Sequence, residues 1–328
     1  MDRLISLTLA CADYDRTAPL ALGDVRPSGI DLTCLRMPVE EVFWRMTRHH
    51  EFDVAEMSIS SYVLRRSRGD DSVVAIPVFT SRSFRHSAIY VNAEAGIERP
   101  QDLRGKRMGV PEYQMTAAVW IRGFLADDYD VHPRDLRWYR GGLEQPGRIE
   151  KLAIEIPGIE IAPIGAHQTL SAMLAAGEID ALMGARAPSS FDGHRVKRLF
   201  PDFRTVEADY YRRTGIFPIM HTVVIRREIL DRVPWVARSL YDAFCEAKAR
   251  AMAEMSDPVA LAVTLPWLIA ELDFTRALMG DDFWPYGAEQ NRATLEALIR
   301  YSHSQGLAAR IVPIEELFAP SSLDEYRI

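Results

Sequence analysis

Cysteine is scarce in this sequence, and the few cysteines present lie too far apart to form a common kind of site. The 328 residues contain only Cys11, Cys34 and Cys245. None belongs to a CxxC pair or stands at the Cys/His spacing typical of zinc ligands. We therefore expect neither a disulfide framework nor a structural zinc site, and the composition favours a reducing compartment.

Long apolar runs and an excess of basic residues are also absent from the sequence. No apolar run approaches the roughly 20 residues of a membrane span. The formal net charge of -7 argues against nucleic acid or an anionic membrane as a partner, because each of these requires a basic face. A few local arginines can still bind a small anion, so the expected partner is a small anionic molecule.

The stretch Leu4–Cys11 has two interpretations. It faintly resembles a lipoprotein export signal, but only about seven apolar residues precede the cysteine, at the bottom of the range for a signal core. We favour the other interpretation, a buried β-strand that ends near Ala10, and expect a cytoplasmic protein.

The length of the chain favours two domains. A globular chain of 328 residues with 48% hydrophobic and 26% charged residues exceeds the usual limit of a single core. The stretch Ile76–Asn92 contains a polar Thr-Ser-Arg-Ser step between two strand-like runs. We interpret this stretch as a crossover between two α/β domains and expect Thr80–His86 to form the floor of a binding site.

Strand and helix patterns alternate along the first part of the chain. Strand-like runs are predicted at 4–10, 30–35, 53–56 and 73–79, and apolar residues fall at helical spacing after Pro38. The alternation predicts a mostly parallel sheet with helices on both faces, in which ligands bind beyond the carboxyl ends of the strands. The candidate cleft residues at these ends are Glu56, Ser58, Ser81 and Arg82.

A second α/β unit follows. Strand-like runs are predicted at 106–110, 136–140, 159–164 and 179–183. A helix is expected to begin near Thr116, where free N–H groups would form an anion site directly after Glu112, Tyr113 and Gln114. A further helix is expected at 169–176, whereas 143–156, which contains GGLEQPGR, is predicted to be an irregular loop.

The chain then returns to the first domain. A strand-like run at 217–225 is the predicted second crossover, and a long amphipathic helix follows from Trp235. Asp257 and Pro258 indicate the cap and first turn of another helix, and 288–305 indicates one more.

These patterns predict domain boundaries. Residues 1–91 and 219–328 form the expected first domain, and 92–218 form the second. The two links between the domains are expected at Ile89–Asn92 and Phe217–Thr222.

Several motifs, taken in order, resemble a known family. DLRGKRMGV and GEIDAL are generic to the type II periplasmic-binding-protein fold, which has two α/β domains, a two-strand hinge and a cleft between the domains. More narrowly, EFDVAEMSISSY, PVFTSRSFRHSAIYVN, GGLEQPGR, GEIDALMGARAP and FPIMHTVVI resemble the 4,5-dihydroxyphthalate decarboxylase family over nearly the whole chain. The resemblance implies a carboxy-lyase that converts 4,5-dihydroxyphthalate to protocatechuate and carbon dioxide without an organic cofactor.

The implied substrate requires anion clamps. Arginine suits this purpose because its planar guanidinium donates two hydrogen bonds to one carboxylate. The arginines in predicted loops or strand ends near the cleft are Arg82, Arg85, Arg148 and Arg186. Each, taken alone, is more often a solvated surface residue. Arg82 is the favoured clamp because it falls at the domain joint.

Histidines and glutamates are the candidates for proton transfer. His86 lies on the outgoing crossover and His221 on the returning one, so we expect at least one of them to act as a catalytic acid or base or, alternatively, both to be hydrogen-bonded hinge residues. His167, which precedes a helix, is a candidate for substrate binding. Glu56 and Glu112 are competing carboxylates, with helix-dipole stabilisation as the alternative for Glu112. No ligand spacing supports a metal site.

Two other classes of function stay open. A solute-binding protein for an aromatic acid would share the fold and the arginine clamps, although the first residues do not favour export. Another lyase acting on a small carboxylate, like those of the futalosine route, would also share the fold. The oligomeric state, for which a homo-oligomer is one option, is not determined by the sequence.

Overall fold

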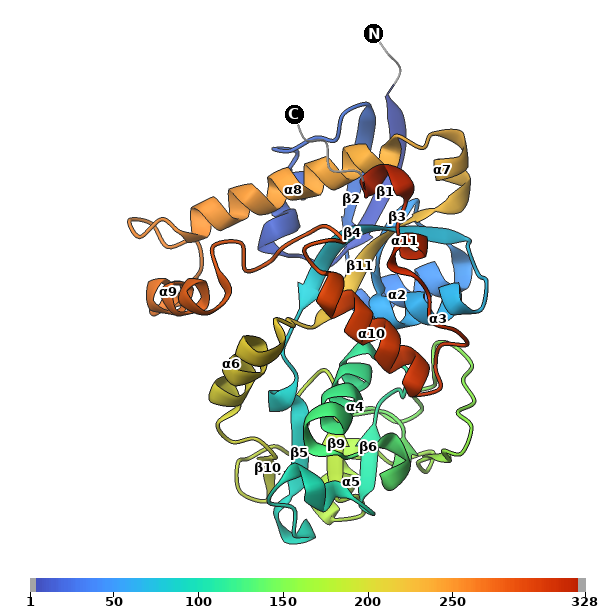
Figure 1. The fold of residues 1–328 in the computed structure, drawn as a ribbon, viewed down its shortest axis with the longest axis vertical. Helices are drawn as coiled ribbons and strands as arrows, with labels where there is room; N and C mark the ends of the chain where they lie inside the picture. Colours follow the sequence, from blue (N-terminus) through green and yellow to red (C-terminus); the bar gives the residue numbers. More distant parts are fainter. Residues whose placement is uncertain (1–3, 324–328) are drawn as a thin grey trace.

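Two β-sheets, one in each half of the molecule, organise residues 4–323, the part of the chain described by the computed structural model. The five-stranded sheet has the order β2-β1-β3-β11-β4, and the six-stranded sheet has the order β10-β5-β9-β6-β7-β8. Figure 1 shows the first sheet in the upper half and the second in the lower half, with α10 and α4 between them. The predicted α/β fold class is confirmed.

The first sheet is mostly parallel, as expected. Its strands are β1 (Ile5–Cys11), β2 (Ile30–Arg36), β3 (Val54–Ser58), β4 (Val73–Arg82) and β11 (Ile219–Arg226). β1 pairs in parallel with β2 and β3, whereas β11 is antiparallel to β3 and β4. Strand β3 is buried along its whole length, and β4 along nearly all of it, because helices pack on both faces.

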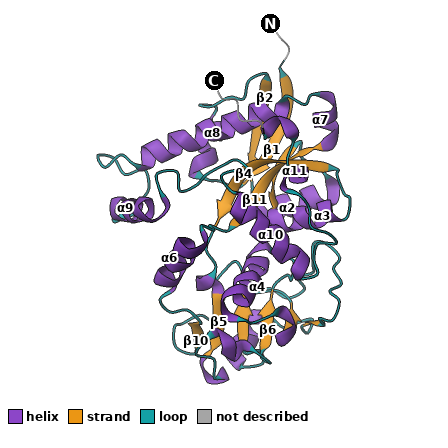
Figure 2. Ribbon diagram, viewed as in Figure 1, coloured by secondary structure: helices purple, strands orange, loops and turns teal. Residues whose placement is uncertain are grey.

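The helices of this half surround the sheet (Figure 2). Helix α2 packs on β3, α3 on β11, and α8 on β4. The helices are α1 (Ala18–Leu22), α2 (Val39–His49), α3 (Ile59–Ser67), α7 (Arg227–Arg232), α8 (Val236–Met255), α9 (Leu268–Met279), α10 (Arg292–Ser304) and α11 (Ile314–Leu317).

The second sheet has a parallel core and an antiparallel edge. Its strands are β5 (Ile89–Asn92), β6 (Arg107–Val110), β7 (Arg137–Arg140), β8 (Ile161–Pro163), β9 (Ala181–Met183) and β10 (Val196–Arg198). β6 is parallel to β7 and β9, while β5 is antiparallel to β9 and β10. The helices of this half are α4 (Thr116–Tyr129), α5 (Leu170–Ala176) and α6 (Phe203–Thr214).

Helix α4 joins the two halves. A Cβ added at Gly123 would lie 2.3 Å from a ring carbon of Tyr301 on α10, so glycine allows the two helices to approach closely. The indole N–H of Trp120 donates a hydrogen bond to the carbonyl of Ile219 at 2.9 Å. The start of α4 is thereby held against the first strand residue of β11.

The two connections between the sheets lie side by side. The N–H of Ser83, just after β4, donates to the carbonyl of Pro218, just before β11, at 3.1 Å. The expected link Ile89–Asn92 forms strand β5 and pairs within the second sheet, so residues 83–88 make that connection instead. The domain boundaries at 91/92 and 218/219 stay a proposal.

Two further expectations have clear outcomes. Residues 143–156 contain neither helix nor strand, as predicted. The prediction of a helix that begins at Asp257 and Pro258 was wrong. The next helix, α9, starts only after Pro266. Across residues 4–323, no helix is both long and apolar enough to cross a membrane.

Candidate active site

A buried glutamate at the carboxyl edge of the first sheet is contacted by two other strands, β4 and β11, and by the segment that follows β1. Glu56, near the end of β3, is fully buried. Its Oε1 accepts hydrogen bonds from Tyr14 (2.7 Å) and Thr80 (2.9 Å) and lies 2.6 Å from Nδ1 of His221. Its Oε2 accepts one from the N–H of Ala12 at 3.0 Å. This is the edge at which ligands bind in parallel sheets.

These contacts fix the charge of Glu56 and the tautomer of His221. Burial raises the pKa of Glu56, but His221 and the hydrogen bonds from Ala12 and Tyr14 outweigh this effect, so the pKa lies below its usual value. An ionised carboxylate only accepts hydrogen bonds, so Nδ1 of His221 must carry a proton. The other ring nitrogen, Nε2, is then available for proton exchange with a ligand.

The pairing of strand β11 with β4 is irregular at His221. The pairing of β11 with β4 shifts register on both sides of His221, which stands opposite Ser81 on β4 and Ser58 on β3. Such irregularities re-aim a side chain and are common beside active sites. The edge of the Phe43 ring packs against the imidazole at a centroid distance of 4.8 Å, and the His221 side chain is 17% exposed.

A cluster of hydroxyls lies where the start of α4 meets β3. Thr116 Oγ1 is 2.9 Å from Oγ of both Ser58 and Ser60. Ser61 donates to Oε1 of Gln114 at 3.0 Å. The Nε2 of Gln114 is buried and has no hydrogen-bond partner among the described residues. The structure therefore brings Ser58, Gln114 and Thr116 together, and their part in substrate binding stays a prediction.

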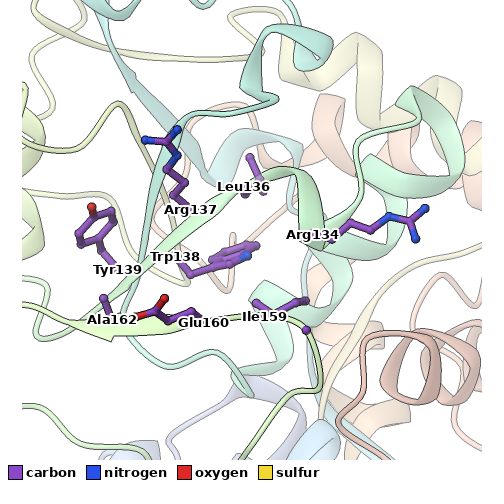
Figure 3. Close-up of a pocket in the computed structure, with 9 residues that line it drawn as sticks. Arg134, Leu136, Arg137, Trp138, Tyr139, Ile159, Glu160 and Ala162 are labelled. Atoms are coloured by element: carbon purple, nitrogen blue, oxygen red, sulfur yellow. The ribbon is translucent and has the colours of Figure 1, made fainter.

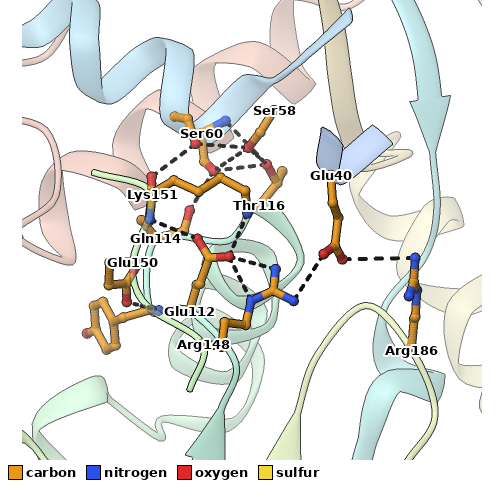
Figure 4. Close-up of polar contacts among 12 residues, drawn as sticks. Glu40, Ser58, Ser60, Glu112, Gln114, Thr116, Arg148, Glu150, Lys151 and Arg186 are labelled. Atoms are coloured by element: carbon orange, nitrogen blue, oxygen red, sulfur yellow. Dashed lines mark hydrogen bonds and ion pairs between the residues drawn. The ribbon is translucent and has the colours of Figure 1, made fainter. Parts of the chain in front are cut away.

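An ion network spans the two halves of the molecule (Figure 4). Arg148 donates to Oε1 of Glu112 from Nε (2.9 Å) and Nη2 (2.6 Å), and Lys151 Nζ lies 2.5 Å from the same oxygen. Arg148 Nη1 lies 3.2 Å from Oε2 of Glu40, and Arg186 Nη2 lies 3.9 Å from Oε1 of Glu40. Glu112 thus faces two cations, Arg148 and Lys151.

A cavity of about 470 Å³ lies beside this network. Its wall includes Glu40 from the start of α2, Met115 from the start of α4, and Arg148 and Arg186 from two loops of the second half. The remaining lining residues are Pro111, 142–147, Ala185 and Ala187. The cavity therefore lies between the two halves and has two arginines in its wall.

Arg85 connects this cavity with the strand that carries His221. Its Nε lies 3.3 Å from Sδ of Met220, the neighbour of His221, and its Nη1 donates to the carbonyl of Ala185 at 3.3 Å. Burial lowers the pKa of Arg85 to about 10, which still leaves the guanidinium charged at neutral pH. A cation therefore lies between the histidine strand and the cavity wall.

Arg82 does not fit the predicted clamp. Its buried guanidinium donates to the carbonyls of Phe217 (3.1 Å) and Pro285 (2.7 Å) and also to Oδ1 of Asn291. Through these hydrogen bonds, Arg82 holds together the returning segment and the residues before α10. We therefore propose a structural role for it.

His86 has surroundings unlike those of His221. It is buried and stacks on Phe124 at a centroid distance of 4.0 Å, with Phe200 and Tyr210 around it. Neither ring nitrogen has a hydrogen-bond partner among the described residues. Burial lowers the pKa of His86 to about 4, so the ring is neutral at physiological pH. Packing is the role that this geometry supports.

Two other predicted binding residues lie outside the cluster. The ring of Tyr113 is buried beneath the guanidinium of Arg122, 3.7 Å from its centroid, and its edge meets Trp138. His167 is exposed on the surface. Ser81 is half-buried and stands opposite His221 on β4.

Three charged or polar residues in these networks were not predicted from the sequence: Tyr14, Glu40 and Lys151. Tyr14 follows the carboxyl end of β1, so the rule that predicted Glu56 could also have found it. Glu40 and Lys151 carry no such signal, because exposed charged residues are common in first helical turns and loops.

Other hollows and clusters do not compete with this site. Figure 3 shows a second cavity, of about 280 Å³, at the edge of the second sheet, lined by residues of β7 such as Trp138 and by residues in and just before β8 such as Glu160. Within residues 4–323, no group of three His, Cys, Asp or Glu side chains is arranged to hold a metal ion.

Comparisons with known proteins agree with this fold and length. A family model described as the periplasmic substrate-binding protein of a phosphonate ABC transporter matches residues 30–208. The aliphatic sulphonate binding protein SsuA of Escherichia coli superposes with a TM-score of 0.54 at 12% identity, covering 97% of this chain and 99% of that one. This likeness concerns the fold alone.

Two enzymes are much more similar in sequence. The chain is 43% identical to 4,5-dihydroxyphthalate decarboxylase of Comamonas testosteroni over 327 residues, 99% of either chain. It is 44% identical to a protein of the same name from Pseudomonas putida over 213 residues, which is 63% of this chain and 82% of that one.

Proposed function

This chain belongs to the 4,5-dihydroxyphthalate decarboxylase family, and we propose that it is a carboxy-lyase that converts 4,5-dihydroxyphthalate to protocatechuate and carbon dioxide. The observation that carries the proposal is the Glu56–His221 pair, in which Nδ1 of the imidazole faces the carboxylate and Nε2 is left for a ligand. A binding protein needs no such base. The solute-binding alternative is also less well supported, since SsuA shares the fold at only 12% identity.

The proposed chemistry needs one base and one new carbon–proton bond. His221 Nε2 accepts the proton of the ring hydroxyl para to the carboxylate that leaves. As the oxygen becomes a carbonyl, the ring carbon bearing that carboxylate takes a proton, which gives a dienone. Cleavage of the carbon–carboxylate bond then expels carbon dioxide, restores the aromatic ring and returns a proton to the oxygen. The net reaction consumes one proton from solvent.

The proposed binding groups are the arginines at the cavity. The substrate carries two adjacent carboxylates, and Arg148 and Arg186 lie in the cavity wall with Arg85 nearby. Arginine binds carboxylates through paired, charge-assisted hydrogen bonds. The hydroxyls of Ser58 and Thr116, at the start of α4, are proposed to bind polar substrate groups at the same edge.

We also propose a cytoplasmic location and a homo-oligomer. Residues 5–11 form β1, which lies between β2 and β3, so cleavage of a lipoprotein signal before Cys11 would remove a central strand. The uncharged segment 258–270 carries exposed apolar side chains that a second copy can cover.

Incubation of the purified protein with 4,5-dihydroxyphthalate tests the proposal. Liquid chromatography should detect protocatechuate, and a carbon dioxide sensor should detect an equal molar amount of gas. Tight binding of the substrate without either product would instead support a solute-binding protein.

A further inference from the structure

The cavity wall contains a carboxylate of the protein itself at the place where the proposed substrate carboxylate would bind. Figure 4 shows Glu40 lying between Arg148 and Arg186, with contacts to both. All three side chains line the cavity of about 470 Å³. Glu40 belongs to the first half of the molecule, whereas the two arginines belong to loops of the second half.

The contacts of Arg148 differ strongly in burial. Glu112 is 2% exposed and holds Nε and Nη2 of Arg148. Glu40 is 45% exposed and contacts only Nη1. A ligand can displace the exposed carboxylate at little cost because water can solvate Glu40 once it is released. Displacement of Glu112 would instead leave a buried charge without its partner.

An ordinary surface ion pair is the competing interpretation, and the neighbouring residue provides the comparison. Glu41 pairs with Arg45 one turn along α2, at 2.9 Å, which is the common pattern on an exposed helix. Glu40 instead reaches across the cavity to Arg148 and Arg186. Among the described residues, neither arginine has another carboxylate of the first half within 4.0 Å.

Charge balance favours an exchange of carboxylates. With Glu40 in place, two carboxylates (Glu40 and Glu112) face three cations (Arg148, Lys151 and Arg186), so the network carries one net positive charge. With Glu40 released, the network carries two positive charges, which match the two carboxylates of a phthalate.

We propose that Glu40 is an internal competitor for the arginine clamp: it pairs with Arg148 and Arg186 in the unliganded protein and is replaced by a carboxylate of the substrate. This inference deepens the proposed function and rests on it for the identity of the ligand. Glu40 thereby weakens binding of every anion that occupies the clamp, because each of them must first displace it.

Calorimetry with phthalate tests the inference, because phthalate carries both carboxylates but lacks the hydroxyl that reacts. Glu40→Gln should lower the Kd for phthalate about fivefold, the scale of one exposed ion pair. Benzoate, with one carboxylate, should also bind the variant more tightly than the wild type. The matched control Glu41→Gln should leave both Kd values unchanged. Melting curves of both variants verify folding.

The outcomes separate the inference from the proposed function. An unchanged or higher Kd for phthalate in Glu40→Gln overturns the competitor role even if the wild type decarboxylates its substrate. Tighter phthalate binding by Glu40→Gln, in a protein that releases no carbon dioxide, supports the competitor and rejects the decarboxylase. Absence of phthalate binding and of turnover in both proteins rejects both.

Discussion

Two histidines of similar sequence context have different surroundings, and side-chain partners decide the difference. His221 faces a buried carboxylate that orients its Nδ1, whereas His86 is enclosed by aromatic rings. A carboxylate that fixes the tautomer of a histidine also stabilises the imidazolium formed when the base takes a proton. Glu56 is therefore proposed as a positioning residue for His221.

Replacement of Glu56 tests this assignment. Glu56→Gln should lower kcat by about 100-fold or more, because the amide cannot stabilise an imidazolium and no longer fixes which nitrogen carries the proton. The Kd for phthalate should change little. Steady-state kinetics and calorimetry measure these quantities, and Glu51→Gln, at an exposed glutamate, is the control. Equal losses of affinity and turnover would indicate a damaged fold instead.

At the scale of elements, apolar patterns in the sequence predict strands and helices well where the side chains are buried. Strands β3 and β4 follow apolar runs because both faces of the sheet are covered there. Side-chain direction at the ends of these strands is not encoded in such patterns. Arg82 was expected to face the cleft, but long-range partners such as Asn291 direct it inward. The place of Tyr14 after β1 marks the same sheet edge, but its contact with Glu56 spans 42 positions of sequence, and no local pattern predicts the contact itself.

The loop 143–156 carries a partly buried carboxyl group, that of Glu150, whose pKa is raised. The N–H of Tyr113 donates to Oε1 of Glu150 at 2.6 Å, while Oε2 is buried without a partner among the described residues. Burial, assisted by the nearby Glu112 charge, raises the pKa of Glu150 to about 7. The loop therefore binds a proton more tightly in the folded protein than in the unfolded chain.

The raised pKa predicts a pH-dependent stability. The contribution of Glu150 is fully present below the unfolded value of about 4.3 and is lost as pH rises toward about 7. Glu150→Gln should therefore stabilise the protein at pH 8 by on the order of 1 kcal/mol, after allowance for solvent screening. Near pH 4 the variant and the wild type should have equal stability. Urea unfolding at both pH values measures the difference, and equal stability at pH 8 would contradict the prediction.

At the scale of the whole molecule, the arrangement of two sheets with a cavity between them resembles that of binding proteins, so function has to be argued from the site and not from the fold. The fold was predictable because the order of strands and helices is strongly patterned. The cavity wall was less predictable, since it is assembled from α2, the start of α4 and two loops.

The exposed segment 258–270 predicts self-association. It contains no charged residue, and its apolar side chains include Val259 at 91% and Trp267 at 74% exposure. A specific interface buries about 1,000 Å² or more in total, so the neighbouring exposed apolar side chains Leu261, Val263 and Leu265 are expected to take part. A second copy offers the same uncharged surface.

Light scattering after size-exclusion chromatography measures this association. The wild type should elute as a multiple of 37.1 kDa, and the double variant Val259→Asp, Trp267→Glu should elute as a monomer. Ile311→Glu, at an exposed apolar residue elsewhere, is the control. A monomeric wild type at micromolar concentration would contradict the prediction.

The kinetics of His221→Asn test the central claim most directly. If His221 is the base, the variant should retain its melting temperature and its Kd for phthalate, while kcat for release of carbon dioxide from 4,5-dihydroxyphthalate falls by about 100-fold or more. Near-full turnover in a folded His221→Asn protein would contradict the account.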